Sequence, residues 1–167
     1  MNKMKGIIIY VEDFKDLEKA YSCKNFFNEK GIVCDVVCCG FFGCHVENES
    51  LDGYLKICLL RGVFFTKDCE GSVIIKRNLK NYLRYLFKPK ITGIINLEKR
   101  WIFVSTDKIH PLITILHEIL HVGRGKNSCK NEKCLGNCNA RHIRLCPECS
   151  KLLDEIFEKY FNTESKY

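Results

Sequence analysis

Hydrophobic positions along the chain follow a strand-like period in some segments and a helix-like period in others. Residues 6–12 and 32–39 are short, largely β-branched apolar runs, which favour buried strands. Between them, residues 16–30 carry apolar side chains at helical spacing and are followed by Gly31, a residue that commonly ends a helix. Because a helix that connects two strands usually makes a right-handed crossover, we expect these strands to pair in parallel.

The middle of the chain predicts more strands, one helix and a hairpin. A glycine-rich loop is expected near residues 40–54. A helix is predicted over residues 78–87, and Pro89 stops it because the residue before a proline avoids the helical conformation. The last two strand candidates flank the charged turn 97–100 and are interpreted as a hairpin. The strand candidates are residues 55–60, 63–66, 71–75, 91–96 and 101–105.

Residues 109–122 form the most apolar helix candidate, and three polar residues interrupt it in the order His-Glu-x-x-His. Pro111 falls in the first turn, where its missing N–H is harmless. Apolar residues occupy almost the whole circumference, which predicts a buried helix. Polar groups buried without partners destabilise a protein by about 1–3 kcal/mol each. A pocket or a metal ion is therefore the simplest explanation for these three residues.

His117 and His121 are the two histidines of this pattern. They lie one helical turn apart, so both imidazoles project from one face about 6 Å apart and can bind one zinc ion. Glu118 lies beside the pair. A carboxylate there can take a proton from a zinc-bound water, whose pKa the metal lowers to about 7. The pattern predicts metal-assisted hydrolysis, most often of a peptide bond.

A second set of metal ligands follows this helix. Two cysteine pairs can present four thiolates to one tetrahedral zinc with a structural role. Between residues 123 and 141 the aliphatic residues are Leu135 and Ala140, so metal binding would supply folding free energy that apolar burial does not. Cys138 and His142 lie between the pairs and could replace one of the four thiols. The paired cysteines are Cys129, Cys134, Cys146 and Cys149.

Residues 115–153 resemble the archaemetzincins, small zinc metallopeptidases of the metzincin group. The shared features are the His-Glu-x-x-His helix followed by glycine, then Cys-x4-Cys, a later Cys-x-x-Cys and a short terminal helix. The resemblance implies one catalytic zinc on His117 and His121, Glu118 as the general base, and one structural zinc on the four paired cysteines. It also implies that the second strand of the hairpin, residues 101–105 before the zinc helix, is an edge strand that binds extended substrate by main-chain pairing.

The resemblance implies a zincin-like α/β (α+β) fold in a single domain spanning residues 1–167. The expected parts are a sheet-rich part at residues 1–108, the zinc-site helix at 109–123, and a cysteine-rich structural zinc region with a terminal helix at 124–167. The expected architecture is a mixed sheet with an edge hairpin strand, a central active-site helix, a C-terminal zinc knuckle and a final helix. At 167 residues the chain is long enough to bury one core.

The third ligand of the catalytic zinc is open. The family pattern places a histidine at Asn127, or at Ser128 if the alignment carries a one-residue insertion, and neither residue type is a good zinc ligand. Two hypotheses of different class follow. The chain is a zinc-dependent peptidase, or it is a catalytically inactive zinc-binding module that acts through a partner or nucleic acid. The other candidates for the third ligand are His142, Cys138, His110, Glu132 and water.

The charge balance bears on the choice of partner. The chain holds 27 Lys and Arg against 20 Asp and Glu, a net charge of +7, and basic residues surround the cysteine pairs. This pattern is typical of nucleic-acid-binding zinc modules. However, a zinc held by four thiolates carries a charge of about −2, which nearby cations would balance. Aromatic residues for base stacking are absent there. We therefore expect a peptide or protein substrate rather than nucleic acid.

The cysteine content and hydropathy predict a cytoplasmic protein. No apolar run approaches 18 residues, and the first residues do not resemble a secretory signal, so we expect a soluble chain without membrane association. In a reducing compartment the 12 cysteines are best interpreted as thiols and metal ligands rather than as disulfides.

Overall fold

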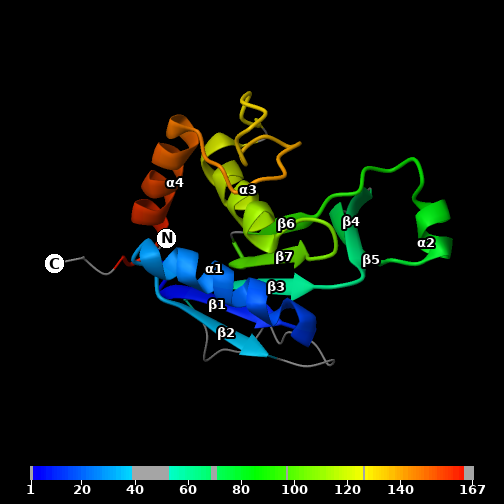
Figure 1. The fold of residues 1–167 in the computed structure, drawn as a ribbon, viewed down its shortest axis with the longest axis horizontal. Coiled ribbons are helices and arrows are strands. Elements are labelled where there is room, and N and C mark those ends of the chain that lie inside the picture. Colours follow the sequence, from blue (N-terminus) through cyan, green and yellow to red (C-terminus); the bar gives the residue numbers. More distant parts are fainter. Residues whose placement is uncertain (1, 39–52, 69–70, 97, 126, 164–167) are drawn as a thin grey trace.

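A five-stranded mixed sheet with helices packed on one face forms the body of the molecule, and a small two-stranded hairpin projects from it (Figure 1). The strands are β1 (Gly6–Val11), β2 (Cys34–Cys38), β3 (Tyr54–Leu60), β4 (Val63–Asp68), β5 (Gly71–Lys76), β6 (Gly93–Asn96) and β7 (Trp101–Ser105). The helices are α1 (Leu17–Glu29), α2 (Leu79–Arg84), α3 (Pro111–Arg124) and α4 (Pro147–Tyr160), with a 3-10 turn, η1 (Phe14–Asp16), before α1. The computed structural model describes residues 2–38, 53–68, 71–96, 98–125 and 127–163.

The strand order in the large sheet is β2-β1-β3-β7-β6. The first four of these strands pair in parallel and β6 pairs antiparallel with β7, which confirms the predicted mixed sheet and its edge hairpin strand. The expectation that residues 101–105 form the edge strand is wrong: β7 lies inside the sheet, because it pairs with β3 as well as with β6, and the edge position belongs to β6, the first strand of the hairpin. Every residue of β1 is buried, which suits the continuous apolar run of this interior strand.

Helices α1 and α3 pack on the same face of the sheet, and α4 packs on α3 (Figure 1). The ring of Phe27 on α1 meets that of Phe157 on α4 edge to face, with centroids 6.0 Å apart. The two ends of the described chain also join, since the backbone N–H of Met4 donates to the carbonyl of Tyr160 at 2.7 Å. One core thus extends from the sheet through α1 and α3 to α4.

The strands β4 and β5 pair only with each other as a separate antiparallel hairpin, among the residues described. The hairpin is attached to the body by backbone hydrogen bonds in both directions between Phe65 and Ile91, at 2.8 and 3.1 Å. An ion pair between Arg77 and Asp107 at 2.9 Å fixes its second strand. The helix predicted over residues 78–87 is shorter than expected and ends as α2 at Arg84.

Two predicted features lie outside the part of the chain that the structure describes, namely Cys39 at the end of the second strand and most of the loop at residues 40–54. Within the described ranges, no helix combines the length and the apolar character needed to cross a lipid bilayer.

Candidate metal centres and the adjoining cleft

Helix α3 carries the His-Glu-x-x-His residues and has well-defined ends. His110 caps the N-terminus, where its Nδ1 accepts a hydrogen bond from the N–H of Leu112 at 3.2 Å, and Pro111 occupies the first turn. Gly125 ends the helix with φ of 65°, a conformation that glycine adopts without steric cost. The predicted start at residue 109 was therefore two residues early. The apolar residues of α3 face the core and leave one polar stripe partly exposed.

The two imidazoles of that stripe face each other. Nε2 of His117 lies 3.0 Å from Nε2 of His121. Each Nδ1 points at a backbone carbonyl, that of Leu135 at 3.0 Å for His117 and that of Gly125 at 2.6 Å for His121. A carbonyl oxygen only accepts, so both Nδ1 atoms carry the ring proton and the two Nε2 lone pairs face each other. A proton or a metal ion must lie between them to offset their repulsion.

Burial disfavours the extra proton. It lowers the pKa of His117, the hydrogen bond to Leu135 opposes this shift, and the neighbouring His121 lowers the pKa further. A divalent cation satisfies the two nitrogens without protonating either ring. Two imidazole nitrogens on one tetrahedral zinc lie about 3.3 Å apart for Zn–N bonds of about 2.0 Å, close to the separation seen here. The donor set of this pair therefore fits zinc.

Among the described residues, the one group of three or more His, Cys, Asp or Glu side chains with ligand atoms close together is the cysteine cluster. No third side chain of these types therefore completes the histidine pair there. His110 caps the helix about two turns before His117. Asn127 and Ser128 line clefts shared with Glu148 of α4. His142 and Glu132 are exposed. Cys138 differs from these candidates, because it lines the same cleft as His117.

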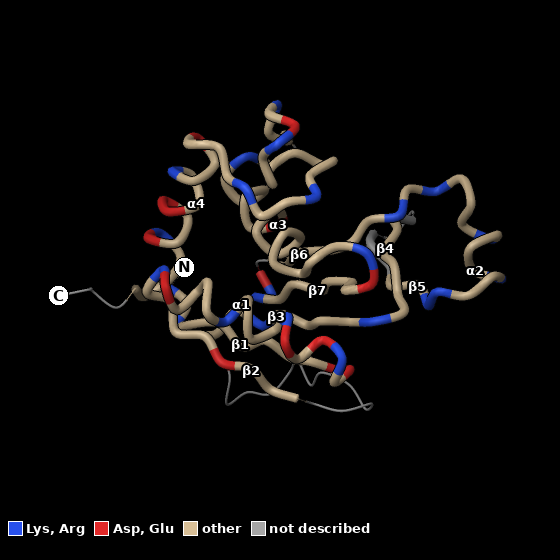
Figure 2. The backbone as a smooth tube through the Cα atoms, viewed as in Figure 1, with Lys and Arg blue, Asp and Glu red and all other residues tan. Residues whose placement is uncertain are grey.

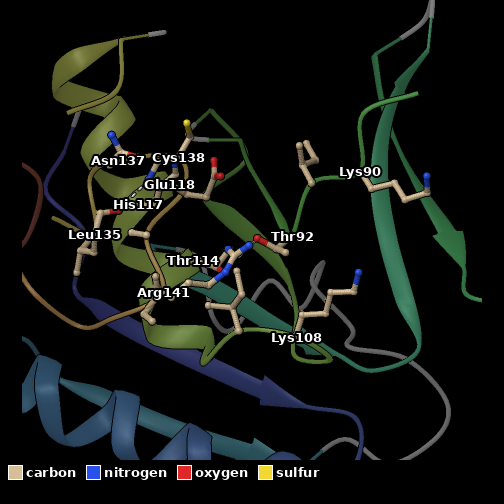
Figure 3. A pocket seen from close by; sticks show the side chains of 14 residues that line it. Lys90, Thr92, Lys108, Thr114, His117, Glu118, Leu135, Asn137, Cys138 and Arg141 are labelled. Atoms are coloured by element: carbon tan, nitrogen blue, oxygen red, sulfur yellow. Dashed lines mark hydrogen bonds between the residues drawn. The ribbon is translucent and has the colours of Figure 1, made fainter. Parts of the chain in front are cut away.

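That cleft has a volume of about 480 Å³ and lies between α3, the approach to β6 and the segment that follows Leu135. Figure 3 shows His117 and Glu118 on its wall, with Asn137 and Cys138 beside them. His121 does not line this cleft. The space thus gives a ligand access to Glu118 and to one of the two imidazoles.

The cysteine-rich segment (residues 127–146) brings four sulfur atoms together with α4. The Sγ atoms of Cys129, Cys134, Cys146 and Cys149 all lie within 4.8 Å of one another. Cys129 Sγ is 3.8 Å from Cys146 Sγ, and two sulfurs on a tetrahedral zinc with Zn–S bonds of about 2.3 Å are separated by about 3.8 Å. The four cysteines predicted from spacing therefore converge, while Cys138 lies outside the cluster and is exposed.

Hydrogen bonds around the sulfurs favour thiolates. The N–H groups of Gly136 and Cys146 donate to Cys134 Sγ at 3.4 and 3.3 Å, and that of Cys149 donates to Cys146 Sγ at 3.4 Å. The guanidinium of Arg124, at the end of α3, donates to Cys149 Sγ at 3.0 Å. Such donors around sulfur are typical of structural zinc sites.

The pKa values of the clustered thiols shift in opposite directions. Burial raises the pKa of the thiols of Cys129 and Cys149. At Cys146, hydrogen bonds from Cys149 and the other cysteines outweigh burial and lower the pKa. Four thiolates so close together repel one another unless a cation compensates them. The charge and geometry of this cluster therefore fit one zinc ion.

Two positions that sequence reasoning did not single out support the sites. A Cβ atom at Gly136 would lie 2.9 Å from Cys149 Sγ and 3.1 Å from Cys129 Cβ, so only glycine leaves room for the sulfurs. The carbonyl of Leu135 orients His117, a role that depends on backbone placement and leaves no signal in residue type.

Comparisons with known proteins show no matching family model and no matching curated protein. A crystal structure of a zinc-dependent peptidase from Methanocorpusculum labreanum has a similar course of the chain, with 12% sequence identity and a TM-score of 0.47. The match covers 89% of this chain and 100% of that one. A likeness of this size carries no functional inference, so we rely on the residues of this chain.

Proposed function

We propose that the chain is a zinc-dependent peptidase in which His117 and His121 bind the catalytic zinc and Glu118 is the general base. The observation that supports this most directly is the pair of Nε2 atoms 3.0 Å apart, each ring held by a carbonyl behind it. Glu118 lies on the same helix and lines the cleft beside the pair. A proton acceptor next to a metal-binding pair is the minimum arrangement for metal-assisted hydrolysis.

Zinc, when bound, lowers the pKa of a coordinated water to about 7 and polarises a carbonyl. The residues of the chain supply the other functions. Glu118 accepts a proton at its carboxylate and can return it to the leaving amine. The carbonyls of Leu135 and Gly125 keep the proton on Nδ1 of each histidine, so Nε2 stays available as a ligand.

The edge strand β6 provides a place for an extended peptide. No strand of the described chain pairs with its outer side, and residues just before it, Ile91 and Thr92, line the cleft. A Cβ atom at Gly93 would lie 2.5 Å from Thr114 Cγ2 and 3.5 Å from Glu118 Cγ, so glycine lets the strand approach α3 closely. A peptide paired with this edge would lie next to Glu118.

We further propose that the four clustered cysteines hold a second, structural zinc. This ion would fix the turns on either side of Leu135, whose carbonyl orients His117. Cys138 and His142 have no place in that ligand set, because their side chains lie outside the cluster. The predicted stoichiometry is two zinc ions per chain.

The second candidate function is an inactive zinc-binding module. It is favoured by one observation, the absence of a third His, Cys, Asp or Glu ligand near the two imidazoles among the described residues. Two imidazoles bind zinc more weakly than three ligands do, and the remaining positions would be filled by water or substrate. The two functions differ in whether the purified, zinc-saturated protein hydrolyses peptides.

The deciding experiment combines metal analysis with peptide hydrolysis. We expect Glu118→Gln to retain two zinc ions and to lose hydrolysis by about 100-fold or more, because only the proton acceptor is removed. His117→Ala should retain only the structural zinc. Glu132→Gln is the matched control, since its carboxylate is exposed and lies outside the cleft. Unchanged hydrolysis in Glu118→Gln would exclude Glu118 as the general base, and no hydrolysis of any peptide by the zinc-saturated protein would exclude the peptidase.

A further inference from the structure

We propose, on the basis of the proposed function, that the cleft selects peptides with a carboxylate close to the scissile bond, and that Arg141 and Lys108 recognise it. Both residues line the cleft that contains His117 and Glu118. Arg141 comes from the cysteine-rich segment and Lys108 from the connection between β7 and α3. Figure 3 shows the Arg141 guanidinium pointing into the space beside Thr92 and Thr114.

The charges around the cleft are unbalanced. Glu118 is the only acid among the lining residues, whereas three cations, Lys90, Lys108 and Arg141, line the same cleft. Figure 3 shows the Lys90 side chain turned away from Lys108 and Arg141. Its Nζ lies 4.9 Å from the centre of the Tyr82 ring. It therefore contributes long-range attraction rather than direct contact. The nearby segment of residues 74–96 carries Lys and Arg but no acid (Figure 2).

Neither Arg141 nor Lys108 has an anionic partner within the described chain, because all ion pairs found there involve other cations. Other arginines behave differently. Arg61 is paired with Asp16 at 2.6 Å, and Arg77 with Asp107 at 2.9 Å. A guanidinium presents a planar fork that matches a carboxylate, so an unpaired arginine in a substrate cleft suits an acidic ligand.

Two hydroxyls add polar contacts at the same place. Thr92 Oγ1 and Thr114 Oγ1 lie 3.3 Å apart, and Figure 3 places both beside the Arg141 guanidinium. Thr114 is buried, so its hydroxyl is held in one position. A carboxylate bound by Arg141 can accept a further hydrogen bond from one of these hydroxyls.

The spacing along α3 sets the distance between this carboxylate and the reacting bond. Thr114 and Glu118 are four residues apart, so their Cβ atoms are separated by about 6 Å on one helix face. An extended peptide covers this distance in about two residues, at about 3.3 Å each. The carboxylate therefore belongs to an Asp or Glu within two residues of the scissile bond, or to a C-terminus at that position.

Matched peptides separate these two sources. One pair of fluorogenic peptides differs only by Glu or Gln near the scissile bond, and a second pair only by a free or amidated C-terminus. We expect kcat/KM to favour the acidic member by about tenfold at low salt, and the ratio to fall as ionic strength rises. A preference within either pair supports the proposal and identifies the source. Equal rates within both pairs would overturn it.

Variants then test the residues. Arg141→Ala should bring the ratio of acidic to neutral kcat/KM close to one, Arg141→Lys should retain part of it, and Lys108→Ala should lower it by about threefold. Arg144→Ala is the matched control, because it removes the same charge from the same exposed segment but does not line the cleft. An equal loss of preference in Arg144→Ala would show that only net charge matters, which would refute the assignment to Arg141.

Binding distinguishes this inference from the proposed function. Zinc-loaded Glu118→Gln should bind the acidic peptides about tenfold more tightly than the neutral ones in fluorescence anisotropy. If the wild-type protein cleaves no peptide, the proposed peptidase function fails. If it cleaves peptides without preference and Glu118→Gln binds both kinds equally, only the selection of acidic peptides fails.

Discussion

The large sheet and the cysteine-rich segment are stabilised by different interactions. In the sheet, β-branched side chains such as Ile7, Ile57 and Ile102 are completely buried between strands and helices. In the cysteine-rich segment the chain forms turns, and the buried side chains are mainly those of the clustered cysteines and Leu135. One region folds by removing apolar surface from water, whereas the other, on the proposed structural zinc, would fold by bringing four sulfur atoms to one cation.

One chain can therefore contain two independent sources of stability. Apolar burial in the sheet is unaffected by chelators. The cysteine-rich segment has few buried apolar side chains of its own, so the proposed zinc would supply most of its stability. The functional cleft lies between the two regions, with α3 on one side and the cysteine-rich segment on the other.

Removing the structural zinc should have the largest effect. A structural zinc contributes about 10 kcal/mol or more to the folding of small domains, so Cys134→Ala should unfold the cysteine-rich segment while leaving the sheet intact. Metal analysis should show the loss of one zinc, and amide hydrogen exchange should show faster exchange in residues 127–146 but not in β1. Cys138→Ala is the control, because Cys138 is exposed and outside the cluster. Slow exchange in that segment of Cys134→Ala would contradict a metal-dependent region.

Truncation of a core side chain should have the next largest effect, and it should not depend on metal. Phe27 is completely buried and contacts Phe157. Phe27→Ala should lower the free energy of unfolding by about 3–5 kcal/mol through lost burial and the cavity it leaves. Denaturant unfolding with and without chelator measures this, and Phe14→Ala, at a side chain 78% exposed, should change stability by less than about 0.5 kcal/mol. A loss that appears only after chelation would show that the two regions are not independent.

The smallest expected effect is at Gly136, where the two regions meet. Gly136→Ala places a methyl group 2.9 Å from Cys149 Sγ, and the crowding should weaken zinc binding by about 1–3 kcal/mol. Competition with a chromophoric chelator measures the affinity. Asn139→Ala serves as the control, since this residue is exposed in the same segment. An unchanged affinity would mean that the sulfurs can move apart without cost.

The sequence predicted the elements whose periodicity is local. The apolar run at β1, the helical spacing of α1 and the His-Glu-x-x-His pattern on α3 match the structure. The run at β2 does form a strand, but the expected burial is wrong, because β2 lies at the edge of the sheet and only Cys34 of its residues is buried. The convergence of four cysteines also follows from local spacing, because each pair sits on a short turn.

The features that were missed depend on contacts between distant parts of the chain. The separate hairpin β4–β5 is held by Arg77 and Asp107, which are 30 residues apart. The position of Arg141 in the cleft depends on how the cysteine-rich segment folds back over α3. The third ligand of the proposed catalytic zinc, which the sequence left open because Asn127 and Ser128 stand at the histidine position of the family pattern, is not found among the described His, Cys, Asp and Glu side chains.

The carbonyl of Leu135 has a consequence for how the protein would become active. It holds the ring of His117, and it directly follows Cys134 in the chain, so one peptide segment serves both metal centres. If the proposed structural zinc orders this segment, the carbonyl would be fixed, and the tautomer of His117 selected, only after the sulfur cluster has bound its ion. Loading of the two proposed sites would then be sequential, and the proposed peptidase made under zinc shortage would stay dormant until its scaffold site is filled.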